Sequence, residues 1–222
     1  MLTGDGPNRS ERKKIEILAA ARGVFLRQGY PDTGMEVVAR MASVSTATLY
    51  AYFPSKAKLF EAVVDDTVRD MAEPVRHSAR AEGDARVRLN ALALGYATFM
   101  AEPATRAMFR MVTTERKRFE PVADQFLLSA NAELGGATIR VLKDLVATGE
   151  LSIPHPSWAA GQLLGMLDHA TLVLGLSAGD EAQPTRPLAD ISADAVETFL
   201  ARYGTHPATS DRAPGRPGRP IA

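Results

Sequence analysis

The fold of this protein is decided by residues 29–56, which run GYPDTGMEVVARMASVSTATLYAYFPSK. Apolar side chains recur at helical spacing over about two turns of residues 35–42, and a second short pattern of the same period covers residues 46–53. The second helix is predicted to end at Pro54, because the residue before a proline is pushed out of the α conformation. Two short helices across a tight connection predict a helix-turn-helix.

A longer helix is predicted before this segment, from Ser10 as its N-cap to Gln28. Gly29 then stands at the position after a helix where glycine is favoured. Thr33 and Glu36 have the spacing of a capping box at the next helix. The expected apolar face of the first helix consists of Ile15, Leu18, Ala19 and Phe25.

Helical periodicity continues through the rest of the chain, whereas alternation with a period of two is almost absent. A fourth helix is predicted to begin at Ser55 and to be kinked or interrupted at Pro74. Further helices are predicted at residues 84–101, 103–113, 121–148, 156–177 and 190–203. The predicted fold class is therefore all-α.

The composition narrows the range of functions. The chain has no cysteine, which excludes disulfides, thiolate nucleophiles and cysteine zinc sites. Lys plus Arg and Asp plus Glu balance at 26 each, but residues 1–60 hold nine basic and five acidic side chains. Only this first quarter is suited to a polyanion. Residues 1–14 lack an apolar signal region, so a cytoplasmic location is expected.

The helix-turn-helix segment closely resembles the DNA-binding region of the TetR family of transcriptional regulators. The residues that carry this resemblance are Val44-Ser45, Thr48-Leu49-Tyr50, Phe53 and Ser55-Lys56. The resemblance implies an N-terminal three-helix head that binds double-stranded DNA, on a larger helical body for ligand binding and dimerisation. It also implies that Tyr50, Tyr52 and Lys56 hold phosphates and that Thr46 and Ala47 lie nearest the base edges. The full predicted DNA-binding set is Thr33, Gly34, Ser45, Thr46, Ala47, Thr48, Tyr50, Tyr52 and Lys56.

The helix-turn-helix geometry itself agrees, since Val44, Leu49 and Phe53 can form an inner face and leave polar residues outside. Two positions depart from the family pattern. Gly34 replaces the usual Ser or Thr and so lacks a hydroxyl for a phosphate. Ser43 replaces the usual Gly, and a left-handed turn there costs Ser about 1 kcal/mol.

The second half resembles the C-terminal domain of the AefR-like branch of the same family. The supporting residues are Ala107 to Val112, Glu115, Phe119, Gly149 to Leu151 and Trp158 to Ala160. This resemblance implies a small, lipophilic effector and a homodimer formed by the last two helices. The candidate cavity residues are Tyr96, Phe99, Met100, Met108, Phe109, Phe126, Met166 and His169, although ordinary core packing is favoured for most of them.

The helix at residues 156–177 is apolar on nearly all sides. Asp168 and His169 lie within it, so a buried helix is favoured over a membrane span. An internal hydrogen bond is favoured over a ligand as the partner of Asp168. With residues 190–203, this helix is predicted to form a four-helix bundle with a second copy, and a central helix of a monomer is the alternative.

The predicted organisation is a flexible arm at residues 1–9, a DNA-binding domain at 10–54, a helical body at 55–203 and a disordered tail at 204–222. Within the tail, Gly215 to Pro220 resembles a degraded AT-hook, although a solvated tail is favoured.

Two other functions stay open. One is a nonspecific architectural DNA-binding protein. The other is an all-α enzyme, against which the histidines are dispersed and no H-E-x-x-H, G-x-S-x-G or phosphate-binding glycine loop occurs. No cofactor, metal or membrane partner is predicted.

Overall fold

The computed structural model describes residues 8–71 and 73–205, so most of the predicted arm and tail, including residues 215–220, lies outside it. The all-α prediction is confirmed. Over the described ranges the chain is helical, and its β structure is limited to one isolated antiparallel bridge between Leu151 and Gly204.

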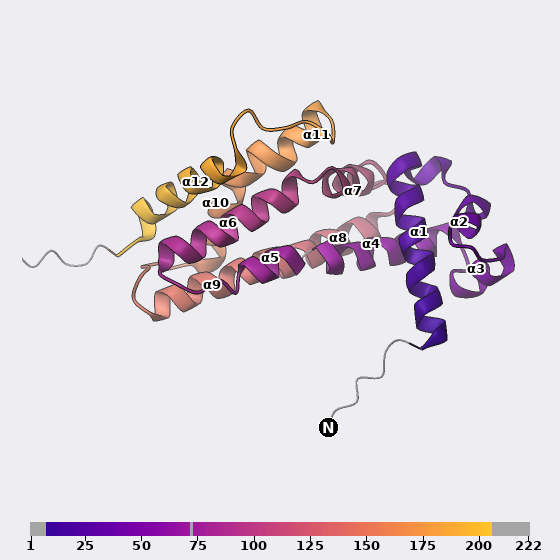
Figure 1. Cartoon of the computed structure of the whole chain (residues 1–222), viewed down its shortest axis with the longest axis horizontal. Coiled ribbons are helices and arrows are strands. Elements are labelled where there is room, and N and C mark those ends of the chain that lie inside the picture. Colours follow the sequence, from indigo (N-terminus) through magenta and orange to yellow (C-terminus); the bar gives the residue numbers. More distant parts are fainter. Residues whose placement is uncertain (1–7, 72, 206–222) are drawn as a thin grey trace, which may run out of the picture.

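The first helices form a compact head at one end of an elongated molecule (Figure 1). They are α1 (Arg9–Asp32), α2 (Met35–Met41) and α3 (Thr46–Tyr52), followed by α4 (Lys56–Met71), which leads into the body. The body contains α5 (Glu73–Ser78), α6 (Ala85–Ala101), α7 (Pro103–Thr114), α8 (Glu120–Ala130), α9 (Gly136–Ala147), α10 (Pro156–Asp168), α11 (Leu174–Ala178) and α12 (Leu188–Tyr203). Helix α6 packs against α5, α10 and α12, and α4 packs against α1 and α8.

Helix α1 begins two residues earlier than predicted and ends differently. Its N-cap is Asn8, whose side chain accepts a hydrogen bond from the Glu11 N–H in a capping box. Gly29 breaks the helix with φ 75°, as its position predicted, but the chain then makes one further helical turn to Asp32.

The predicted face of α1 is wrong in part. Leu18 and Phe25 are buried, but Ile15 is 55% exposed and Ala19 is also exposed. Packing against α2, α4 and α7 instead selects a stripe displaced around the helix, which comprises Ile17, Leu18, Ala21, Val24 and Phe25.

The junction between α1 and α2 also differs from the prediction. Gly34, not Thr33, is the N-cap of α2, and no side chain caps this helix. The Thr33 hydroxyl donates to the Gly29 carbonyl at 2.7 Å, so the proposed capping box with Glu36 is absent. After α2, Ser43 has φ 52°, which confirms the left-handed turn.

In the body, the predicted helix boundaries are close to those observed. Asp84 caps α6 by accepting from the Val87 N–H at 2.9 Å. Two predicted continuous helices are interrupted by π-helical turns, η1 (Asn131–Gly135) between α8 and α9 and η2 (His169–Val173) between α10 and α11.

An apolar cluster joins the head to the body. Phe25, Tyr30 and Phe60 of the head and α4 pack ring to ring, and Phe119 of the body packs on Tyr30 with ring centroids 4.5 Å apart. Met108, Met111 and Phe126 extend the same cluster into α7 and α8. The head is therefore held to the body by shared core packing and not by a bare linker.

One helical stretch, Pro156–Ala178, is long enough and apolar enough in composition to cross a membrane. The sequence predicted a buried helix, but only 33% of the most apolar 18-residue segment of this stretch is buried within the protomer. Its exposed side chains recur every three or four residues along one face, which we call the outer seam. The outer seam comprises Trp158, Gln162, Gly165, His169, Val173 and Leu176.

Candidate nucleic-acid interface and body cavity

Helix α3 is fixed on the head by its cap and its inner face. The Ser45 hydroxyl accepts from the Thr48 N–H at 3.0 Å and lies 2.8 Å from the Thr48 hydroxyl. Leu49 and Phe53 are buried against the other head helices, and Val44 is half-buried in the same cluster. The predicted inner face is therefore confirmed.

The opposite face of α3 points to solvent. Thr46 and Ala47 are exposed, and Tyr50 is 45% exposed. Short side chains at the start of a helix and a phenol one turn later suit entry into the major groove, where base edges offer donors, acceptors and methyl groups. The arrangement is the one in which the second helix of a helix-turn-helix contacts DNA.

Tyr52 links α3 to the start of α1. It is half-buried, and its hydroxyl lies 3.1 Å from the Ser10 hydroxyl. This contact places the first turns of α1, with Arg9, Arg12 and Lys14, beside the candidate recognition helix. Ser10 was predicted only as a cap, because sequence spacing gives no sign of a contact over 42 positions.

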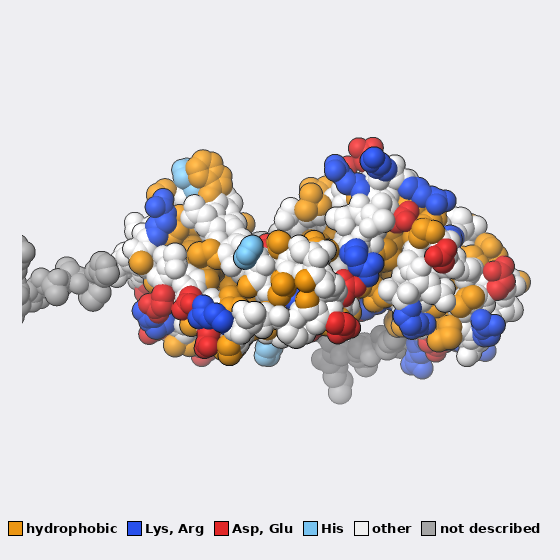
Figure 2. Space-filling model, turned by 90° about the horizontal axis from the view of Figure 1, so that it is seen from above, with side chains coloured by type: hydrophobic (Ala, Val, Ile, Leu, Met, Phe, Trp, Pro, Cys, Tyr) orange, Lys and Arg blue, Asp and Glu red, His pale blue; other side chains and the backbone are white. Residues whose placement is uncertain are grey.

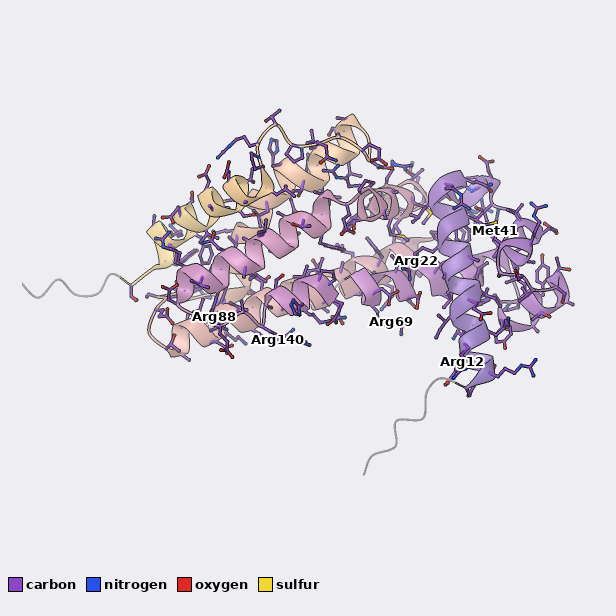
Figure 3. The ribbon with its side chains drawn as sticks, in the orientation of Figure 1. Arg12, Arg22, Met41, Arg69, Arg88 and Arg140 are labelled. Carbon is purple, nitrogen blue, oxygen red and sulfur yellow. The ribbon has the colours of Figure 1, made fainter. Side chains whose placement is uncertain are left out.

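Arg9, Arg12 and Lys14 thus lie at the end of the molecule that carries α3. Figure 3 shows Arg12 at the foot of α1 and Met41 at the end of α2. Figure 2 shows several Lys and Arg side chains over the head end. Exposed Arg40 and Met41 border the turn before α3 and were not among the predicted interface residues.

Two predicted phosphate contacts need correction. The Lys56 ammonium donates to the carbonyls of Tyr30, Pro31 and Thr33 at 2.9, 3.0 and 2.9 Å. An ammonium has three N–H donors, so Lys56 is fully occupied in closing the end of α1. Thr33 is buried and its hydroxyl is used within the protein, so it presents no group to a phosphate. Gly34 is half-buried at the start of α2.

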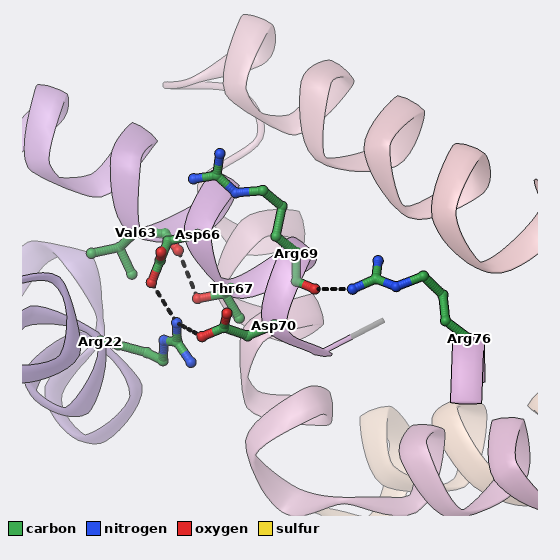
Figure 4. A network of polar contacts seen from close by, with 7 residues as sticks. All are labelled: Arg22, Val63, Asp66, Thr67, Arg69, Asp70 and Arg76. Atoms are coloured by element: carbon green, nitrogen blue, oxygen red, sulfur yellow. Dashed lines mark hydrogen bonds and ion pairs between the residues drawn. The ribbon is translucent and has the colours of Figure 1, made fainter. Parts of the chain in front are cut away.

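Charged side chains fasten α1 to α4. Arg22 donates to Asp66 at 2.6 Å and to Asp70 at 2.9 Å, as Figure 4 shows. At the far end of α4, Arg76 donates to the carbonyl of Arg69 at 3.0 Å. These contacts join α4 to α1 of the head and, at its other end, to α5 of the body.

The body contains a cavity of about 400 Å³ bordered by α6, α8, η1, α9 and α10. Of the predicted effector residues, Tyr96, Met100 and Phe109 line it. Phe99, Met108 and Phe126 instead surround a space of about 10 Å³ next to Phe109, too small for a ligand.

The remaining two predictions for this cavity are wrong. Met166 and His169 do not line it, and His169 lies on the outer seam. Adjacent helical residues point about 100° apart, so the inward direction of Asp168 turns His169 outward.

Asp168 is the charged residue of the cavity wall. Its Oδ1 accepts a hydrogen bond from the Tyr96 hydroxyl at 2.8 Å, which confirms an internal partner for this side chain. Burial raises the pKa of Asp168, and the hydrogen bond from Tyr96 opposes that rise. Burial is the main cause that raises the pKa of Tyr96, and the charge of Asp168 and the hydrogen bond to it raise this pKa further. The Tyr96 hydroxyl therefore stays neutral and donates the hydrogen bond.

An outward recognition helix on a three-helix head, joined by α4 to a helical body with a cavity, defines a helix-turn-helix transcriptional regulator. The sequence profile of the bacterial regulatory proteins of the tetR family matches residues 17–63, and that of the C-terminal domain of AefR-like transcriptional repressors matches residues 87–205. The chain belongs to the TetR family and carries an AefR-like C-terminal domain.

Known proteins agree at the levels of sequence and fold. The chain is 37% identical over 90 residues to the transcriptional activator FasR of Mycolicibacterium smegmatis, a match that covers 40% of this chain and 41% of FasR. It superposes on a regulator assigned to the TetR family from Mesorhizobium loti with a TM-score of 0.83 and 25% identity, covering 89% of this chain and 100% of that one. The flavonoid-responsive regulator FrrA gives a TM-score of 0.68 with 26% identity, covering 87% of this chain and 97% of FrrA.

The chain spans less than half the length of the curated relatives it matches. The curated and structural relatives are transcriptional regulators and not enzymes.

Proposed function

We propose that the protein is a homodimeric repressor whose heads, residues 10–54, bind a palindromic operator and whose bodies, residues 55–203, release it on binding a small effector. The observation that carries this proposal is the exposed face of α3 beside the basic first turns of α1. Repression is favoured because the profile of the C-terminal domain describes repressors, although FasR is an activator. The expected location is the bacterial cytoplasm, where the DNA is.

The outer seam supports the homodimer. Trp158 is 71% exposed at one end of the seam and Leu176 is exposed at the other, while Gly165 allows close approach between them. A face of this kind is self-complementary about a twofold axis. Two heads related by that axis meet half-sites about 10 base pairs, or a multiple of that spacing, apart.

The cavity and the shared core support effector control. Phe109 lines the cavity and packs edge-on against Phe126, with ring centroids 4.9 Å apart, in the cluster that reaches the head. A ligand that moves α7 or α8 therefore acts on the packing of α1 and α4. The similar protein FrrA is a flavonoid-responsive regulator, which agrees with control of this protein by a small molecule. A coupling of about 1–3 kcal/mol is the usual size for such control.

The alternatives are less well supported. An architectural DNA-binding protein needs no cavity with a polar group inside it. For an enzyme, neither the curated relatives nor the similar solved structure gives support, since they are transcriptional regulators.

The test is selection of bound duplexes from a random DNA pool by the full-length protein. The expected result is one preferred sequence with dyad symmetry, bound at least about 10³-fold more tightly than scrambled DNA. Recovery of no preferred sequence supports the architectural alternative and contradicts the proposal.

The same selection tests the orientation of α3. Thr46→Ala is expected to change the preferred base at one position of each half-site, because Thr46 is exposed at the start of α3. Glu61→Ala, on α4 away from this face, is the matched control and is expected to leave the preferred sequence unchanged. An unchanged preference in Thr46→Ala contradicts the orientation.

A further inference from the structure

The walls of the body cavity are almost free of charge. Asp168 is the charged residue of its lining, and the other polar side chains there belong to Tyr96, Asn131 and Ser157. No Lys, Arg or His side chain lines it. The volume of about 400 Å³ is within the range of small-molecule sites, about 300–1,000 Å³.

The Asp168 carboxylate lies in the wall of this mostly apolar cavity, and one of its two oxygens has no protein partner among the described residues. Its Oδ1 is occupied by Tyr96, and among the described residues no other hydrogen bond or ion pair reaches the carboxylate. Asp168 is half-buried, and partial burial without a neighbouring cation disfavours the charged form of its carboxylate. A ligand that brings a positive donor to the free oxygen removes that cost.

The backbone around the cavity is unusual in two places, each a π-helical turn. The π-helical turn η2 begins directly after Asp168 and contributes Leu172 to the lining, and η1 contributes Asn131, Leu134 and Gly135. Both π-helical segments in the described parts of the chain thus border this one cavity. Such turns are rare and occur frequently at functional sites.

We propose that the effector of this cavity is an apolar molecule with a single protonated amine, which pairs with the Asp168 carboxylate beside the Tyr96 hydroxyl, and that apolar carboxylates and phosphates are rejected. The proposal rests on the proposed function only in calling this ligand the effector. An anionic head group meets a like charge at Asp168 and finds no cation on the walls. A neutral alcohol can donate one hydrogen bond and is the intermediate case.

The experiment compares three ligands that share one alkyl chain and differ in the head group. Decylamine, decanol and decanoate are titrated calorimetrically into the full-length protein at pH 7.5, below micelle formation. Decylamine is expected to bind at least about 10-fold more tightly than decanoate, since one hydrogen-bonded ion pair in a partly buried site contributes this much or more. The complementary substitution is Asp168→Asn, which keeps an oxygen for the Tyr96 hydroxyl.

Asp168→Asn is expected to weaken decylamine at least about 10-fold and to leave decanol nearly unchanged. The matched control is Asp190→Asn, which removes an exposed carboxylate of α12 and is expected to leave all three affinities as in the wild type. Circular dichroism checks that both variants keep their helical content. Equal or tighter binding of decanoate, no binding of decylamine, or an amine preference that survives in Asp168→Asn overturns the proposal.

The DNA measurement separates this failure from failure of the proposed function. If an operator is selected and decanoate is preferred over decylamine, the ligand class is wrong while the regulator stands. If decylamine binds through Asp168 but leaves operator affinity unchanged, the cavity chemistry stands and effector control is wrong.

Discussion

Ser43, in the turn between α2 and α3, adopts a backbone conformation that is unfavourable for serine. Its φ of 52° lies in the left-handed region, which favours glycine because a Cβ crowds the backbone there. The side chain is exposed, so it gains little packing in return. The turn is nevertheless required, because it sets the direction in which α3 leaves the head.

Ser43→Gly is expected to raise the free energy of unfolding by about 0.4–1 kcal/mol, because glycine relieves the left-handed strain. Urea denaturation measures the change. Ser43→Ala keeps the Cβ and is the control, expected to give no gain. A loss of stability in Ser43→Gly would show that the serine contributes more than its backbone strain costs.

Asp168→Asn is expected to raise the melting temperature at neutral pH. The folded-state pKa of Asp168 lies above its unfolded value, so the wild type loses stability as the pH rises through the folded pKa. The advantage of the variant is therefore expected to be largest near neutral pH and to shrink toward pH about 4, near the pKa of an unfolded Asp. Thermal unfolding across this range checks the trend, and a pH-independent difference contradicts it.

At the scale of elements, charged groups fasten helix ends. Lys56 at the start of α4 closes the last turn of α1, and Arg106 of α7 anchors the segment after η2. Arg106 is fully buried, and its guanidinium donates to the carbonyls of Thr171, Asp180 and Ala182. Gly175 faces it, where any Cβ would collide with the arginine stem.

Lys56→Met is expected to destabilise the protein by about 1–3 kcal/mol, because three carbonyls lose a charged donor. The salt dependence of DNA binding is expected to stay as in the wild type. Lys58→Met removes an exposed ammonium paired with Glu61 and is expected to cost less than about 1 kcal/mol. If the salt slope of Lys56→Met falls by about one while stability is kept, Lys56 is a phosphate ligand after all.

Arg106→Met is expected to cost about 3 kcal/mol or more, since one buried and two partly buried carbonyls lose a charged donor. Arg110→Met, one turn further along α7, removes an exposed ion pair with Asp180 and is expected to cost about 1 kcal/mol or less. Chemical denaturation of both variants gives the comparison. Similar losses in the two variants would mean that Arg106 contributes no more than a surface pair.

At the scale of the whole molecule, the outer seam and the head lie on different parts of one elongated protomer (Figure 1). The seam supports pairing of two copies, and pairing multiplies weak contacts of each head with DNA. Linked binding sites gain about 10²–10⁴-fold in affinity over single ones. In a single protomer, much of the apolar helical stretch Pro156–Ala178 stays uncovered.

Gly165→Arg is expected to yield a folded monomer with at least about 100-fold weaker operator binding. A Cβ at Gly165 meets no atom within 4 Å in the protomer, so the change blocks a partner without disturbing the fold. Gly165→Ala keeps the seam small and is expected to stay dimeric. Light scattering gives the mass, and a dimeric Gly165→Arg contradicts the role of the seam.

The sequence by itself determined the helices and the helix-turn-helix, because apolar periodicity, prolines and glycines act locally. It also located the left-handed turn at Ser43 and the inner face of α3. The tertiary structure alone decided that Lys56 and Thr33 bond inside the head, that Ser10 meets Tyr52, and that Asp168 points into the cavity while His169 points out. These features depend on contacts between distant residues and on π turns that shift a helix face, and neither leaves a mark in local spacing.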